Sequence, residues 1–245
     1  MIIQSMPYPS GPAVPVTAYS TAQVVALFTT NILGAAYDFT DGTKLAINAD
    51  GTGGSPAMDG VVRWAVDQSP NGNHLRNTLP SGLPVRRANG VETSGTAYGL
   101  FNQAGNGTWA NIAEPYEIVG RFAQITHSAN GRILGLANNA STAFLQGATS
   151  GNVEFFSGNA GPALAPGLNT EFTIDGLFTA AARTQSLNGG ASQDLGLAAA
   201  SVGALTLGST DGGASFAAIR FKRLMIIGRA LTGAERAGVT AWVAA

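Results

Sequence analysis

The segment RWAVDQSPNGNHLRN, residues 63–77, places small oxygen-bearing side chains at alternate positions of a turn-rich loop. These side chains belong to Asp67, Ser69, Asn71 and Asn73. The spacing lets one tight loop direct several oxygens at a hard cation such as Ca²⁺, although the twelfth position is Thr78 and not the bidentate acid of a calcium loop. In the alternative, Asp67 and Asn71 accept backbone N–H groups in Asx turns while Gly72 takes a positive φ. We favour the second interpretation, a structural corner.

Two histidines, His74 and His127, are the remaining imidazole donors for a metal. Neither has a second imidazole or a carboxylate at useful sequence spacing, and a zinc site needs three or four ligands. The sequence therefore predicts surface or loop histidines. With no cysteine in the chain, thiolate metal sites are excluded as well.

The stretch YGLFNQAGNGTWANIAEPYE, residues 98–117, combines aromatic rings and amides in loop-rich surroundings. Aromatic rings can stack on the C–H faces of a sugar, and amides can bind its hydroxyl groups. The candidate carbohydrate-binding residues are Tyr98, Asn106, Trp109, Asn111 and Tyr116. In the alternative, Trp109 and Tyr116 fill the core between sheets or contact a neighbouring subunit.

Glycoside hydrolysis needs two carboxyl groups on either side of the scissile bond. No E-x-D-x-x-E pattern projects such a pair from one strand. Glu171 and Asp175 are four residues apart and share one strand face, but beside Thr173 they are more typical of a solvated sheet surface. We therefore assign no catalytic residue and expect no enzyme.

The composition favours strands and tight turns over a charged surface. Charged residues make up 11% of the 245, Gly numbers 33, and the net charge is −1. A chain without positive excess attracts neither nucleic acid nor an anionic membrane surface. No apolar run reaches the roughly 18–20 residues of a membrane helix, so we expect no membrane partner.

The pattern along the chain predicts one all-β domain preceded by an arm. Residues 1–17 are rich in proline and read as an extended arm, and residues 18–245 form the domain. A short helix is predicted at 21–28 after Ser20, and a C-terminal helix after the capping box TGAE that Thr232 begins. Between them, short apolar or alternating runs predict strands at 61–66, 117–126, 132–136, 153–156, 171–178, 183–187, 204–207 and 216–227. Many short strands separated by turns indicate an antiparallel sandwich.

The sequence also resembles the concanavalin A-like (LamG-like) jelly-roll domains of phage and prophage virion proteins. In the first half the resemblance rests on FTTNILGAAYDFTDGTKLAINADGTGGSP, VVRWAVDQSPNGNHLRN and LPVRRANGVETSGTAYGL, and in the second half on SLNG and LMIIGRALTGAE. It covers residues 18–245 in the family's order, with Pro70 in place of the usual glycine of the turn. It implies two curved antiparallel sheets in a virion accessory protein, with glycan binding as the commonest chemistry.

These observations lead us to expect a virion structural or accessory protein, such as a head decoration, head fibre or tail component. It would assemble in the host cytoplasm and dock to other virion proteins, as a homo-oligomer or bound to the capsid or tail. A second hypothesis is a glycan-binding adsorption module for host polysaccharide, and a third is a glycoside hydrolase. No cofactor is expected apart from Ca²⁺ at the 67–73 loop.

Overall fold

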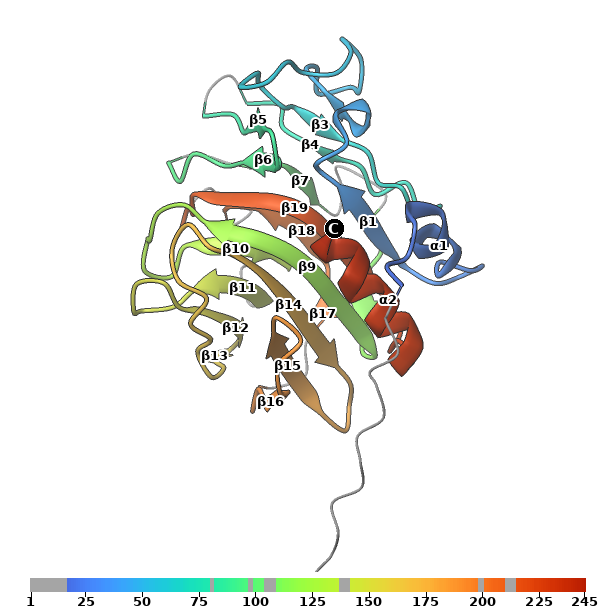
Figure 1. Ribbon diagram of the computed structural model, residues 1–245, viewed down its shortest axis with the longest axis vertical. Coiled ribbons are helices and arrows are strands. Elements are labelled where there is room, and N and C mark those ends of the chain that lie inside the picture. Colours follow the sequence, from blue (N-terminus) through green and yellow to red (C-terminus); the bar gives the residue numbers. More distant parts are fainter. Residues whose placement is uncertain are drawn as a thin grey trace, which may run out of the picture.

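The computed structural model describes residues 17–79, 82–96, 99–103, 109–136, 142–197, 201–209 and 215–245. Within these ranges, antiparallel strands form two large sheets, with one helix near each end of the chain (Figure 1). The predicted all-β antiparallel sandwich is confirmed. Nearly all of the predicted arm, together with Tyr98 and Asn106, lies outside the described residues.

The helices are α1 (Thr21–Ala26) and α2 (Gly233–Ala244), and one 3₁₀ turn, η1, spans Gly42–Lys44. The strands are β1 (Gly34–Asp38), β2 (Leu45–Ala46), β3 (Trp64–Ala65), β4 (Leu75–Arg76), β5 (Val85–Arg87), β6 (Gly90–Glu92), β7 (Phe101–Gln103), β8 (Ile112–Ala113), β9 (Tyr116–Gln124), β10 (Arg132–Gly135), β11 (Thr142–Gln146), β12 (Val153–Ser157), β13 (Asn159–Ala160), β14 (Glu171–Phe178), β15 (Arg183–Leu187), β16 (Gln193–Asp194), β17 (Ser201–Val202), β18 (Ala204–Leu207) and β19 (Ile219–Ile227).

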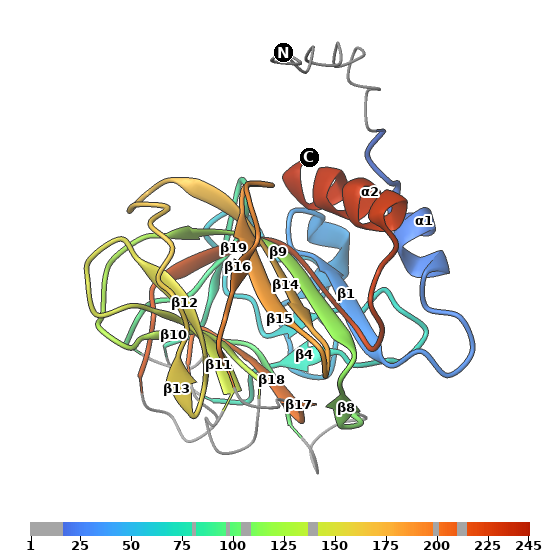
Figure 2. The same ribbon diagram turned by 90° about the horizontal axis from the view of Figure 1, so that it is seen from below.

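The first sheet has the order β16-β15-β14-β9-β19-β6-β5, and β1 also pairs with β19. Strand β19 is long enough to pair with β6 through Arg220 and Phe221 and with β1 from Arg223 onward. The second sheet has the order β13-β12-β11-β10-β18-β7-β4-β3-β2, and β8 and β17 form a separate pair. Figure 2 shows α2 on the outer side of the first sheet, away from the second.

The main core fills the space between the two sheets. In β14, Phe172, Ile174 and Phe178 are fully buried, because alternate side chains of a strand point to the same face. Phe122 of β9 contacts Phe221 of β19 edge to face, with ring centroids 5.6 Å apart. Aromatic pairs of this kind add to the stabilisation from burial.

A second apolar cluster holds α2 against the outer face of the first sheet. The helix begins with the predicted capping box between Thr232 and Glu235. Its Val239, Trp242 and Val243 are buried in a cluster that includes residues of β1, β9 and β19, as their shared helical face predicts. The same contact explains why β19 changes from half-exposed at Arg220 and Lys222 to buried at its end.

Strand β1 shows why some elements escaped prediction. Its sequence GAAYD has no alternation, and all five residues are buried. One face of β1 packs into the main core and the other under the helices, so polar and apolar residues do not alternate along the strand. Neither described helix is long and apolar enough to cross a membrane.

Candidate functional site

The 67–73 loop is a corner closed by hydrogen bonds. Asp67 is buried, and its carboxylate accepts the backbone N–H groups of Ala36 at 2.9 Å and Asn73 at 2.8 Å, as well as both the N–H and the hydroxyl of Ser69. The side-chain amides of Asn71 and Asn73 donate to the carbonyl of Gly34. Because the Asp67 oxygens already face N–H and O–H donors, the geometry favours the Asx-turn interpretation over a calcium site. Among the described residues, no cluster of acidic or imidazole side chains could hold a metal.

We expect Asp67→Asn to lower the free energy of unfolding by about 1–3 kcal/mol, because an amide nitrogen cannot accept the N–H groups that one carboxylate oxygen accepts. Denaturant unfolding measures the loss. Asp50→Asn is the matched control, since Asp50 is exposed and bonds to Thr52 within its own turn. Equal stability of wild type and Asp67→Asn would contradict the corner. So would a rise in Tm on adding Ca²⁺ that the substitution abolishes.

The described residues of the predicted carbohydrate patch do not form one surface, because two of them are buried and one is exposed. Trp109 is buried and donates its indole N–H to the carbonyl of Val202 at 3.0 Å. Tyr116 is also buried, and its ring stacks on Phe178 with centroids 4.6 Å apart. Asn111 remains exposed. Both rings therefore serve the core, the alternative considered for them, and no sugar can stack on them in this arrangement.

The histidines are structural as well. His74 Nδ1 accepts the backbone N–H of Asp67 at 3.1 Å, and its ring lies 5.0 Å from that of Trp64. His127 Nε2 is 2.9 Å from the carbonyl oxygen of Gly147. Each imidazole thus contacts the backbone, and both histidines lie in loops, as predicted.

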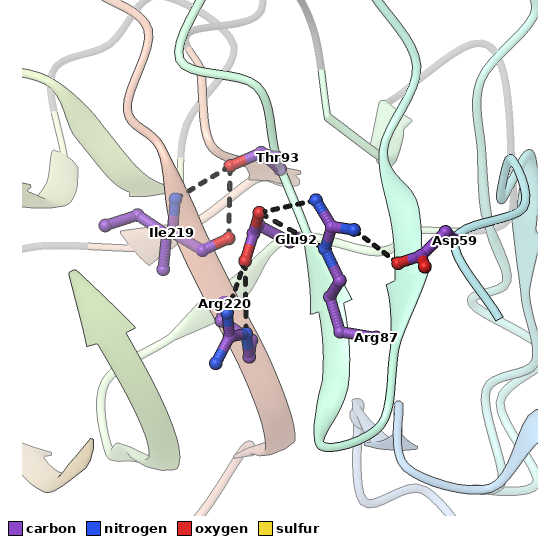
Figure 3. Close-up of polar contacts among 6 residues, drawn as sticks. All are labelled: Asp59, Arg87, Glu92, Thr93, Ile219 and Arg220. Atoms are coloured by element: carbon purple, nitrogen blue, oxygen red, sulfur yellow. Dashed lines mark hydrogen bonds and ion pairs between the residues drawn. The ribbon is translucent and has the colours of Figure 1, made fainter. Parts of the chain in front are cut away.

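An ion-pair network crosses β5, β6 and β19 on the outer face of the first sheet (Figure 3). Glu92 is its centre: one carboxylate oxygen accepts from Arg87 at 3.0 Å and the other from Arg220 at 2.6 Å. Arg87 also pairs with Asp59, and the neighbouring Thr93 bonds to the backbone of Ile219. Because both Glu92 oxygens are used in joining strands, we interpret this cluster as cross-strand support.

A cavity of about 570 Å³ lies between α2 and the outer face of β14 and β15. The strands and their hairpin contribute Thr173, Asp175, Ser186, Gly189, Gly190 and Ser192, and the helix contributes Gly233, Arg236, Ala237, Thr240, Ala241 and Ala244. Gly233, Ala237 and Ala241 are four residues apart and so lie on one helical face. Their small side chains leave the space that larger residues would fill. A smaller cavity of about 80 Å³ adjoins it, lined by Asp175, Leu177, Thr184, Ser186, Ser192 and Arg236.

Two residues of the cavity wall, Asp175 and Arg236, meet the buried carboxylate of Glu117 behind it. Glu117 of β9 is fully buried and accepts Nε of Arg236 at 2.6 Å, Nη2 of Arg236 at 2.9 Å and the backbone N–H of Leu231 at 2.9 Å. Asp175 Oδ2 lies 3.2 Å from Nε of Arg236. Asp175 Oδ1 is buried and accepts no hydrogen bond from the described residues. Asp175 is therefore the carboxyl group of this cluster with one buried oxygen that has no hydrogen-bond partner among the described residues.

The surroundings favour a proton on Asp175. Burial, and after it the negative charge of Glu117, raise the pKa of Asp175 to about 7, although the positive charge of Arg236 lowers it. Two neighbouring carboxylates that share one cation titrate as a pair. Near neutral pH Asp175 is thus still partly protonated, whereas a carboxyl group in water would have lost its proton.

The sequence prediction placed Asp175 on a solvated surface together with Glu171. Glu171 does lie there, where it pairs with Arg121 and Lys222. Asp175 differs because α2 covers its end of β14. The sequence did signal the covering element, because the amphipathic helix after TGAE was predicted. The spacing of its residues does not show that Arg236 contacts Glu117, which lies 119 residues earlier.

No family model matches the sequence, and no curated protein matches it. Among solved structures, the chain is similar to the sialidase of Trypanosoma rangeli in complex with 2,3-difluoro-KDN, with a TM-score of 0.59 and 12% identity over 87% of this chain and 33% of the sialidase. It is also similar to an arabinofuranosidase complexed with arabinofuranosyl-α-1,2-xylobiose, with a TM-score of 0.53 and 14% identity over 86% of this chain and 62% of the enzyme. The chain thus spans about a third of the sialidase and less than two thirds of the arabinofuranosidase.

These comparisons correct the expected function. We expected a virion structural protein without enzymatic activity, but the similar solved structures are glycoside hydrolases. At 12–14% identity the likeness establishes a shared fold. What this chain does with that fold has to be argued from its own residues.

Proposed function

We propose that the chain is a glycoside hydrolase domain that binds a glycan in the cavity between α2, β14 and β15, with Asp175 as the proton donor. The proposal depends on Asp175, because this residue lines the cavity and has a pKa near neutrality. One of its oxygens also has no hydrogen-bond partner among the described residues. A general acid works best when its pKa lies near the pH of the reaction. The acid of a glycosidase also has a raised carboxyl pKa, which lets it keep its proton until it donates it.

The rest of the cavity suits a sugar. Its volume of about 570 Å³ lies within the range of small-molecule sites, about 300–1,000 Å³. Hydroxyl groups come from Thr173, Ser186, Ser192 and Thr240, and the alanines of α2 add apolar surface. Hydroxyl side chains both donate and accept hydrogen bonds, as sugar hydroxyls do. The shared fold with a sialidase and an arabinofuranosidase supports the same reading.

Hydrolysis of 4-nitrophenyl glycosides and of arabinoxylan tests the proposal, with reducing-sugar release as the measurement. We expect Asp175→Asn to lower kcat/KM at least about 100-fold, the usual contribution of a general acid. Wild-type activity should fall as the pH rises above about 7, because Asp175 then loses its proton. This alkaline limb should be absent in Asp175→Asn.

Glu171→Gln is the matched control, since Glu171 lies on the same strand outside the cavity. We expect it to keep wild-type activity. Equal activity of wild type and Asp175→Asn would contradict the proposal, as would a wild-type protein that hydrolyses none of the glycosides. Circular dichroism should confirm that both variants are folded.

A further inference from the structure

The cavity between α2, β14 and β15 has two chemically different walls. The strand wall carries the hydroxyl groups of Thr173, Ser186 and Ser192. On the helix wall, four lining residues have no side chain larger than a methyl group: Gly233, Ala237, Ala241 and Ala244. Hydroxyl side chains exchange hydrogen bonds with sugar hydroxyls, and methyl groups are stabilised when they are covered by C–H surface. A sugar unit that turns its hydroxyl groups to the strands and a C–H face to the helix therefore suits both walls.

The charges at the cavity wall distinguish uncharged sugars from acidic ones. Among the described residues that line the two cavities, Asp175 and Arg236 alone have charged side chains. Arg236 is not a free cation, because the Glu117 carboxylate accepts two of its hydrogen bonds and Asp175 Oδ2 lies 3.2 Å from its Nε. The three side chains together are uncharged when Asp175 holds its proton, and they carry one negative charge when it does not.

The neighbouring cations of the sheet and of the loop before α2 are also paired. Arg121 and Lys222 bind Glu171, and Arg229 binds Glu235. A sugar carboxylate in the cavity would thus lie beside two carboxyl groups and find no unpaired cation among the described residues of its walls. Burial of a charge without a partner is costly, and like charges placed together disfavour a ligand.

We infer that the cavity selects an uncharged sugar unit and rejects sugars that carry a carboxylate, an inference that rests on the proposed function and its glycan site. An uncharged sugar approaches Asp175 without repulsion and leaves the ion pair between Glu117 and Arg236 in place. The selectivity is specific to this chain, because it follows from these three side chains and not from the shared fold.

Matched pairs of 4-nitrophenyl glycosides test the inference on the full chain. A glucoside and a glucuronide, or a galactoside and a galacturonide, differ only where a carboxylate replaces a CH₂OH group. Nitrophenol release by the wild type gives kcat/KM, and calorimetry with the sulfur-linked analogues, which resist hydrolysis, gives the affinity. We expect the uncharged member of at least one pair to exceed its acidic partner at least about 10-fold in both, because like charges in a partly buried site repel strongly.

Substitutions on α2 test whether the cavity walls are responsible. Ala244→Lys adds a cation at an exposed lining position in the last turn of the helix, where lysine is favourable. It should raise the affinity for the acidic member relative to the uncharged member about 5-fold. Ala241→Leu fills the cavity and should abolish binding of the uncharged member. Ala234→Leu, exposed on the same helix outside the cavity, is the matched control and should bind as the wild type does.

This inference and the proposed function fail differently. If an acidic glycoside binds as tightly as its uncharged partner, or if Ala244→Lys leaves the ratio of affinities unchanged, the inference is overturned, whereas hydrolysis that depends on Asp175 still supports the proposed function. Equal binding by Ala241→Leu and Ala234→Leu would also overturn the inference. If the uncharged analogue binds and Ala241→Leu abolishes this binding, but the wild type hydrolyses no glycoside, the proposed hydrolysis is overturned and the selectivity stands. If no glycoside binds, both proposals are overturned.

Discussion

Glu117→Ala lowers the free energy of unfolding by about 3–5 kcal/mol, the usual cost of removing one partner of a buried ion pair. The carboxylate of Glu117 is fully buried and holds Arg236 through two hydrogen bonds. It also accepts the N–H of Leu231 just before α2, so alanine removes the acceptor of three N–H donors and leaves Asp175 as the remaining ion-pair partner of Arg236. Because these contacts join β9 to α2, the substitution should also loosen the helix from the sheet.

Chemical denaturation measures the effect, and Glu171→Ala provides the comparison. Glu171 also pairs with two cations, Arg121 and Lys222, but at the surface, where its side chain is 27% exposed. Surface ion pairs contribute only about 0–1 kcal/mol. Similar losses for the two variants would show that burial of Glu117 is not what stabilises the contact with α2.

The second large effect concerns Asp175 and the pH dependence of stability. Folding raises the pKa of Asp175 from its ordinary 3.8 to about 7, mainly through burial. A group whose pKa rises on folding stabilises the folded state fully below its unfolded pKa, and that contribution is lost as the pH rises through the folded value. We expect a loss on the order of 4 kcal/mol between pH 4 and pH 8.

Unfolding of wild type and Asp175→Asn across this range separates the contribution of Asp175 from the others. Asparagine does not titrate, so only the wild type should lose this contribution as the pH rises. The free energy of unfolding of the wild type minus that of Asp175→Asn should therefore decline from pH 4 to pH 8. Glu235 behaves in the opposite way: hydrogen bonds from Arg229 lower its pKa to about 2, and its contribution is already constant above pH 5. Parallel stability curves for wild type and Asp175→Asn would contradict the raised pKa.

Local sequence patterns correctly predicted the parts of the fold that depend on residues close together in the sequence. Strand β14 has the predicted bounds because Phe172 and Ile174 alternate with Thr173 and Asp175. Helix α2 begins where Thr232 and Glu235 form the capping box. The corner at Asp67 was also predicted, because Asx turns bond to backbone groups two residues away. Strand β1 was missed because a strand that is buried on both faces shows no period.

The sequence by itself determined the all-β class, the two helices, and the absence of cysteine chemistry. Only the tertiary structure decided which acid lies in a cavity, since β9, β14 and α2 bring Glu117, Asp175 and Arg236 together from distant positions. The tertiary structure also decided that Trp109 and Tyr116 are buried in the core and do not form a surface patch. The physical reason is that the pKa of an acid and the exposure of an aromatic ring depend on which element covers the residue. Contacts between segments that are far apart in the sequence decide which element that is. Period and spacing record only which residues share a face.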